Sequence, residues 1–136
     1  MSSRWITMTA AAAVMTGCVL FGGKVELSTS PTMPAAEGSV RFSTTKNDNT
    51  SIVLSVKHLA HPDKLTPPAT SYVVWTQANK DTLPQSIGAL KVDSNLSGSL
   101  LAETPLHSFN LFITAEGSGQ AQQPTGTPLL WTDFSR

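Results

Sequence analysis

Apolar and polar side chains alternate along most of the chain after residue 40, and this period of two is what most constrains the fold. In the segment SIVLSVKHL, Ile52, Leu54 and Val56 fall on one face. Ser55 and Lys57 fall on the other face. Such alternation is typical of β-strands with one buried face, because successive strand side chains point to opposite sides. Similar runs between turn residues predict strands at 40–45, 51–59, 71–77, 85–92, 96–102, 107–116 and 129–134.

The order of these strands predicts two packed sheets. The turn KNDN joins strands 40–45 and 51–59 into an antiparallel hairpin, and SYVVWTQ (71–77) is apolar on both faces, as in a central strand. Turn signals recur every 8–12 residues and no stretch has a helical period. We therefore expect an all-β, immunoglobulin-like antiparallel β-sandwich of about seven or eight strands over residues 40–136. A closed barrel is the alternative.

The first residues of the chain are typical of an export signal. Arg4 supplies positive charge, and the uncharged segment that follows it, up to Gly17, is shorter than the about 20 residues of a membrane span. Cys18 is the only cysteine, and the sequence MTGC resembles a bacterial lipobox, in which the diacylated cysteine becomes the mature N-terminus. We predict a lipoprotein signal peptide at 1–17 and lipidation at Cys18.

Two alternatives for this segment stay open. An uncleaved anchor from Trp5 to Gly23 is long enough to cross a bilayer, and a plain secretory signal would be cut near Gly17. All three interpretations export the rest of the chain. Residues 18–39 then form the lipidated cysteine and a linker or first edge strand, in which Lys24 to Leu27 could pair at a sheet edge. We expect the protein in the bacterial cell envelope, lipid-anchored and facing the periplasm or the cell exterior.

Net charge argues against nucleic acid as a partner. Nine basic and nine acidic residues cancel, so the sequence predicts no basic face for phosphates. The partners expected are the membrane, through the lipid anchor, and an unidentified envelope protein.

Catalytic patterns are missing from the sequence. No G-x-S-x-G elbow follows a strand, the acidic residues are scattered singly, and no thiol remains once Cys18 is acylated. We predict no catalytic residues, no enzyme activity and no cofactor.

Three histidines offer an alternative function. His58, His61 and His107 could ligate zinc or copper if the fold brought them together. HLAHP nevertheless falls at a strand end entering a loop, and no acidic ligand accompanies it, so histidines on turns are the simpler interpretation. The alternative function is a periplasmic protein that binds a metal or a small ligand through these three residues.

Aromatic residues suggest a second kind of site. Trp75, Trp131, Tyr72 and Phe112 could form a platform for sugars or a partner protein. The other interpretation is that they fill the sandwich core, as a tryptophan of a central strand does. Trp75 favours the core because its neighbours are Val73 and Val74, whereas Trp131 lies in the last strand and is open to either interpretation.

Three stretches resemble a known family. YVVW (72–75), SIGALKVDSN (86–95) and SFNLFITAEGSGQAQQPTGTPLL (108–130) follow one another as they do in the extracytoplasmic C-terminal domain of anti-sigma-K factors, and the resemblance covers residues 72–130. It implies a β-sandwich outside the membrane. Since we expect a lipid anchor ahead of the sandwich where that family has a membrane helix, the resemblance carries no regulatory role. We therefore expect a non-enzymatic interaction or scaffold module.

Overall fold

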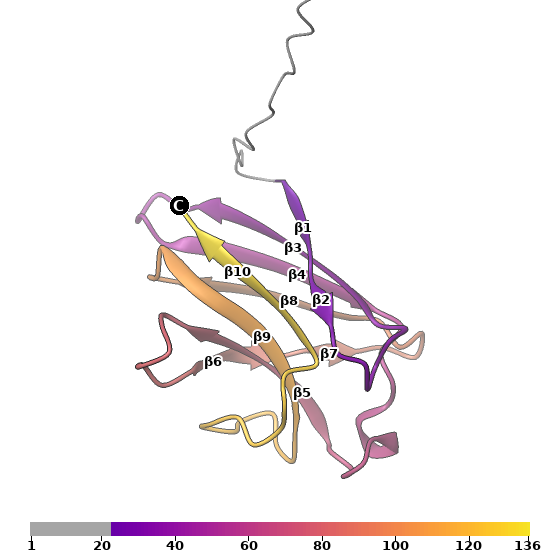
Figure 1. Ribbon diagram of the computed structural model, residues 1–136. Helices are drawn as coiled ribbons and strands as arrows, with labels where there is room; N and C mark the ends of the chain where they lie inside the picture. The colour runs from indigo at the N-terminus through magenta and orange to yellow at the C-terminus, as the bar shows by residue number, and fades with distance from the viewer. Residues whose placement is uncertain (1–22) are drawn as a thin grey trace, which may run out of the picture.

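The computed structural model describes residues 23–136, and within them the protein is all-β, with two antiparallel sheets of five strands each (Figure 1). The first sheet has the order β1 (Lys24–Glu26), β3 (Glu37–Thr44), β4 (Thr50–Lys57), β8 (Gly98–Thr104), β7 (Lys91–Val92). The second sheet has the order β2 (Ser28–Thr29), β10 (Leu130–Ser135), β9 (Ser108–Glu116), β5 (Ser71–Gln77), β6 (Gln85–Ala89). One short 3₁₀ turn, η1 (Pro62–Lys64), interrupts the β-structure.

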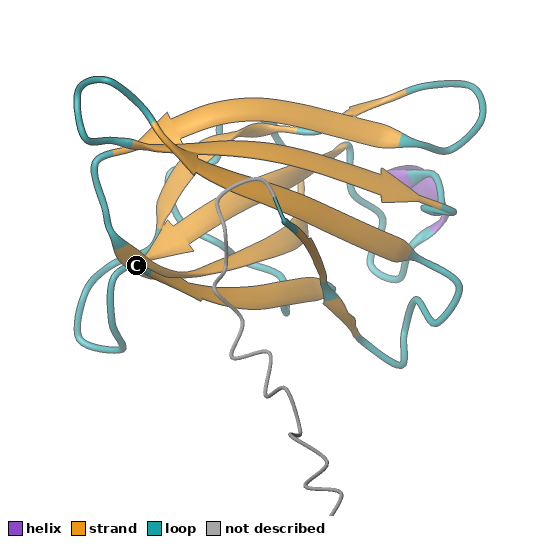
Figure 2. Cartoon of the chain, turned by 90° about the horizontal axis from the view of Figure 1, so that it is seen from above, coloured by secondary structure: helices purple, strands orange, loops and turns teal. Residues whose placement is uncertain are grey.

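The two sheets pack face to face around a single main core, as the view from above shows (Figure 2). Both sheets supply the apolar inward residues of their strands, so the alternation in the sequence becomes an inside and an outside in space. The largest fully buried side chains of this core are Tyr72, Phe109, Ile52, Leu54, Leu59, Leu111, Ile113 and Leu130.

The predicted hairpin is confirmed in detail. Strands β3 and β4 pair antiparallel through the turn at 45–49, with Val40 opposite Leu54 and Phe42 opposite Ile52. All four side chains are at most 4% exposed. The predicted central strand is also confirmed, because β5 lies between β6 and β9.

The segment 24–39 belongs to both sheets. Strand β1 pairs with β3 and strand β2 pairs with β10, so the chain crosses from one sheet to the other at Leu27. The side chains of Leu27, Met33 and Ala36 are buried in the core. A β-carbon on Gly38 would collide with the Leu27 side chain and would lie 2.9 Å from Leu130, so this crossing requires a glycine.

The ten strands exceed the seven or eight expected. Strand β1 is the edge strand considered for Lys24 to Leu27, β2 was not expected, and one more strand arises because the strand expected at 85–92 divides into β6 and β7. At the division the buried Leu90 donates its backbone N–H to the Tyr72 carbonyl oxygen (2.8 Å), and Gly88 has a φ of 143°. The chain thereby passes from the second sheet to the first. The two sheets stay separate, which corresponds to the sandwich and not to the closed barrel.

Candidate functional site

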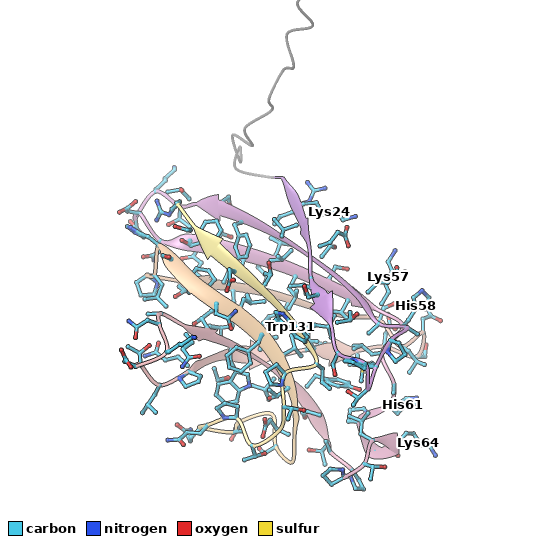
Figure 3. The ribbon with its side chains drawn as sticks, in the orientation of Figure 1. Lys24, Lys57, His58, His61, Lys64 and Trp131 are labelled. Carbon is cyan, nitrogen blue, oxygen red and sulfur yellow. The ribbon has the colours of Figure 1, made fainter. Side chains whose placement is uncertain are left out.

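The three histidines of the predicted metal site do not share one location. His58 directly follows β4, and His61 precedes η1 on the same side of the molecule (Figure 3). The His107 ring nitrogen Nε2 lies 2.9 Å from the Asp48 carbonyl oxygen and 3.3 Å from the Asp48 carboxylate. Asp48 is in the turn before β4, so the full strand, about 25 Å long, separates it from His58.

That separation removes the common metal site proposed for these histidines. Within residues 23–136, no group of three or more His, Cys, Asp or Glu side chains is placed to hold a metal ion. His107 instead belongs to a clamp at one end of the sandwich. There Arg136 donates to the Asp48 carboxylate (3.1 Å) and to the Asp48 carbonyl oxygen (2.7 Å).

Three of the four aromatic residues do lie together, on the outer face of the second sheet. Trp131 of β10 is the cross-strand neighbour of Phe112 in β9, and Phe112 is in turn the neighbour of Trp75 in β5. Tyr72 points the other way, into the main core, where it donates to the Ala60 carbonyl oxygen (2.6 Å) and where burial raises its pKa to about 12. The predicted platform therefore contains Trp75, Phe112 and Trp131 only.

These three aromatic residues differ in how far they are covered. Trp75 is fully buried and Phe112 is 6% exposed, together with Val73 in a second apolar cluster. Trp131 packs against this cluster but stays partly exposed (Figure 3). Ala121, in the loop between β9 and β10, packs against the same cluster. The loop therefore lies against the cluster that contains Trp75, whereas Trp131, at the edge of the cluster, stays partly exposed.

A buried carboxylate attaches this loop to the sheet. Glu116, at the end of β9, is 2% exposed and accepts hydrogen bonds from Thr125 through its backbone N–H (3.0 Å) and its hydroxyl (2.5 Å). It also accepts from the Gly126 N–H (3.3 Å) and the Thr114 hydroxyl. Thr114 Oγ1 in turn accepts the Trp75 indole N–H (2.8 Å). One chain of hydrogen bonds therefore links the buried tryptophan to the loop that covers it.

The same contacts determine how Glu116 titrates. Burial alone raises the pKa of a carboxyl group, but the hydrogen bonds from Thr114, Thr125 and Gly126 stabilise the charged form and outweigh burial. The pKa of Glu116 is therefore below its ordinary value, and the group is ionised at neutral pH.

The loop also approaches the sheet closely at Gly126, where a β-carbon would lie 2.9 Å from the Ala115 carbonyl oxygen.

Beside Trp131 the outer face is hollowed. One hollow of about 380 Å³ is lined by Asn110, Phe112, Pro128 and Trp131. A second, of about 610 Å³, shares the lining residue Asn110 and is also lined by Asp133, Gln77 and Lys80 and, at the end of the strands, by Phe109 and Phe134. We call these two hollows together the outer groove.

Polar side chains in the outer groove are aligned by the sheet. Gln77, Asn110 and Asp133 are successive cross-strand neighbours on β5, β9 and β10. The Asn110 amide nitrogen donates to the Asp133 carboxylate (2.7 Å) and to the Thr132 carbonyl oxygen (3.2 Å). This row runs next to the row of Trp131, Phe112 and Trp75. The groove therefore combines one partly exposed indole ring with fixed amide and carboxylate groups.

Sequence reasoning identified the aromatic residues of this face but missed its polar ones. The available signal was the period of two itself, because Asn110 is two residues before Phe112 and Asp133 is two residues after Trp131. Residues with that spacing on a strand share a face. Nothing local marks Glu116 as buried, since Thr125 and Gly126, its partners in the loop, lie nine and ten residues further along the chain.

Comparison with known proteins adds no family. No protein-family model matches this sequence. No curated protein matches it either. The resemblance of residues 72–130 to the anti-sigma-K domain thus stays a prediction.

Two further features concern the membrane. The predicted lipidation site, Cys18, lies outside the described residues. Among residues 23–136 there is no helix with the length and apolar character that crossing a bilayer requires.

Proposed function

We propose that this protein is a lipid-anchored, extracytoplasmic binding module of the bacterial cell envelope, without enzyme activity, and that it engages its partner through the outer groove. The observation that carries the proposal is the partly exposed Trp131 beside the fixed pair Asn110 and Asp133. A tryptophan at the edge of a rigid sheet offers a large contact area at a small entropic cost. Preorganised polar groups beside it add specificity.

The export signal supports the location. Arg4, the uncharged segment and the MTGC motif favour a diacylated Cys18 as the mature N-terminus. Strand β1 begins at Lys24, six residues later, and six residues of extended chain span at most about 20 Å. An anchor at Cys18 would therefore hold the sandwich close to the lipid head groups.

An immunoglobulin-like arrangement is the finer fold that we propose for the two sheets. Both sheets are antiparallel, the core lies between them, and the loops connect strands at the two ends of the sandwich (Figure 2). Domains of this architecture bind through end loops or through an exposed face. The resemblance to the anti-sigma-K domain supports the same architecture and adds no regulatory function.

Acyl labelling tests the anchor. Cells expressing the full chain are grown with an alkyne-bearing palmitate, and the purified protein is probed for the label. We expect labelling of the natural sequence, its loss in Cys18→Ala, and transfer of that variant from the membrane to the soluble fraction. The matched control Ser3→Ala should keep both properties. An unlabelled natural protein, or an unchanged membrane-bound fraction in Cys18→Ala, contradicts lipidation at Cys18.

Photo-crosslinking in intact cells tests the binding face. A benzophenone amino acid is placed at Lys80, an exposed position that lines the outer groove, or, as the control, at Leu101, which is 74% exposed on the first sheet. We expect ultraviolet light to produce an adduct from position 80 and none from position 101. Equal adducts from both positions, or none from position 80, would overturn the assignment of binding to the outer groove.

A further inference from the structure

We propose that the ligand of the outer groove is a saccharide, whose ring stacks on Trp131 while its hydroxyl groups bind Asn110 and Asp133. This inference deepens the proposed function and depends on it, because it names the chemical class of ligand for the same face. It rests on the shape of the groove, on the two kinds of surface within it, and on its charge.

The shape fits a short chain of sugars. The groove crosses β10, β9 and β5, since it is lined by Trp131, Asn110 and Gln77. Neighbouring strands are about 4.8 Å apart, so two spacings give a length of about 10 Å. A disaccharide has this length. The two hollows share Asn110 as a lining residue, so each sugar ring would occupy one hollow with Asn110 between them.

The apolar part of the groove matches the face of a sugar ring. Trp131, Phe112 and Pro128 line it, and of the two aromatic rings Trp131 is the more exposed. A pyranose carries several C–H groups on one face, and these polarised C–H groups are attracted to the electron-rich face of an indole. Stacking of this kind needs a flat, rigid aromatic ring, which the packing of Trp131 against the buried Phe112 provides.

The polar part of the groove matches sugar hydroxyl groups. Asn110 and Asp133 are held together by the 2.7 Å hydrogen bond, so their positions are fixed before a ligand arrives. Both hydrogen bonds of Asn110 use its amide nitrogen, which leaves the carbonyl oxygen as an acceptor, while Asp133 has a second carboxylate oxygen. Adjacent hydroxyl groups of a sugar can donate to two such oxygens at once.

The charge of the groove and its place on a sheet face disfavour other classes of ligand. Asp133 and Lys80 are the two charged residues that line the groove, so it carries no net charge for a polyanion or a strongly charged peptide. A peptide that extends a sheet needs an unpaired strand edge. The groove lies instead over the outer face of the sheet, and its middle strand, β9, is paired on both sides; β10 pairs with β2 only at Leu130 and Trp131, so its free edge lies at the side of the groove.

The test measures direct binding by the full-length protein in detergent micelles. The probes are cellotetraose, maltotetraose, the tetramer of N-acetylglucosamine and a peptidoglycan disaccharide, and the readouts are calorimetry and tryptophan fluorescence. We expect saturable binding of at least one probe, a loss of affinity of tenfold or more in Trp131→Ala, and partial retention in Trp131→Phe. Asp133→Ala, at an exposed position, should weaken binding without changing the far-ultraviolet spectrum. The first-sheet control Leu101→Ala should bind as the natural sequence does.

Several outcomes would overturn the saccharide. These are binding of none of the four probes, or binding that is unchanged in both Trp131→Ala and Asp133→Ala. An adduct from the crosslinker at position 80 in which mass spectrometry finds peptides of a second protein would identify a polypeptide partner. That result would reject the saccharide and leave the proposed function standing, whereas the absence of any adduct would reject both.

Discussion

The outer faces of the two sheets are built from the same kind of strand but differ in what covers them. On the first sheet one cross-strand row consists of exposed residues: two cations, followed by Val53 (47% exposed) and Leu101 (74% exposed). On the second sheet the corresponding row is aromatic, with Trp131 partly exposed, Phe112 and Trp75 buried. One face meets solvent directly, and the other carries its own loop.

The difference shows that a sandwich of two sheets can bury residues on an outer face as well as in the core between the sheets. Strands β3 and β4 alternate between buried and exposed positions, as strands with one solvent face do. Strand β5 is buried at five consecutive positions. On its outer side Val73 and Trp75 belong to a cluster against which Trp131 and Ala121 pack, and Ala121 belongs to the loop that Glu116 holds. The outer face around Trp131 stays partly exposed, and the outer groove lies there.

The largest effect on stability is expected from Trp75→Ala. This change removes a fully buried indole and leaves a cavity beneath the loop, which costs about 3–5 kcal/mol. Equilibrium urea unfolding of the purified protein measures it. Trp75→Phe, which keeps a ring but loses the hydrogen bond to Thr114, should cost clearly less. A loss below about 1 kcal/mol in Trp75→Ala would mean that the second sheet is no better covered than the first.

A smaller effect is expected from Glu116→Ala. The change leaves the Thr125 and Gly126 N–H groups without their acceptor and should cost about 2 kcal/mol. Glu116→Gln keeps one carbonyl oxygen as an acceptor, so its free energy of unfolding should lie between those of Glu116→Ala and the natural sequence. Amide hydrogen exchange adds a local readout, with faster exchange expected at positions 125 and 126. Protection there that does not change in Glu116→Ala would contradict the role given to this carboxylate.

Acid should also lower the free energy of unfolding, because it protonates the carboxylate that attaches the loop. Because the pKa of Glu116 is lower in the folded protein than in the unfolded chain, its contribution to stability is complete above the unfolded pKa of about 4.3. That contribution is lost as pH falls through the folded pKa. Urea midpoints measured from pH 7 down to pH 3 should fall more steeply for the natural sequence than for Glu116→Gln. Parallel curves would assign the acid sensitivity to other groups.

The smallest effect is expected on the first sheet. Val53→Thr and Leu101→Thr replace exposed residues by another strand former, so each should change the free energy of unfolding by less than about 0.5 kcal/mol. The same urea measurement applies. A loss above about 2 kcal/mol in either variant would show that this face is covered too, and the contrast between the sheets would fail.

Most of the fold was predictable because it depends on local alternation. Hairpin β3–β4 and the central position of β5 follow from which side chains are apolar and from where the turns lie. The crossings between sheets were not predictable in this way. At Leu27 and Leu90 a single buried leucine replaces the strand pattern, and which sheet a strand joins depends on distant partners.

The candidate site was predictable only in part, for the same physical reason. Trp131 and Phe112 were identified as candidate platform residues because aromatic residues are few in this sequence, at 7%. Their grouping with Asn110 and Asp133 depends on the register between β9 and β10, which no local pattern fixes. The histidines depend on tertiary structure in the same way: closeness of His58 and His61 in sequence said nothing about His107, which lies at the other end of β4.

Hydroxyl-radical footprinting, read residue by residue by mass spectrometry, tests most directly whether the second sheet is covered by a loop that Glu116 holds. In the native protein Trp131 should be oxidised several times faster than Trp75, and Glu116→Ala should raise the rate at Trp75 towards that of Trp131. Equal rates at the two tryptophans in the natural sequence, or a rate at Trp75 that Glu116→Ala leaves unchanged, would contradict the account.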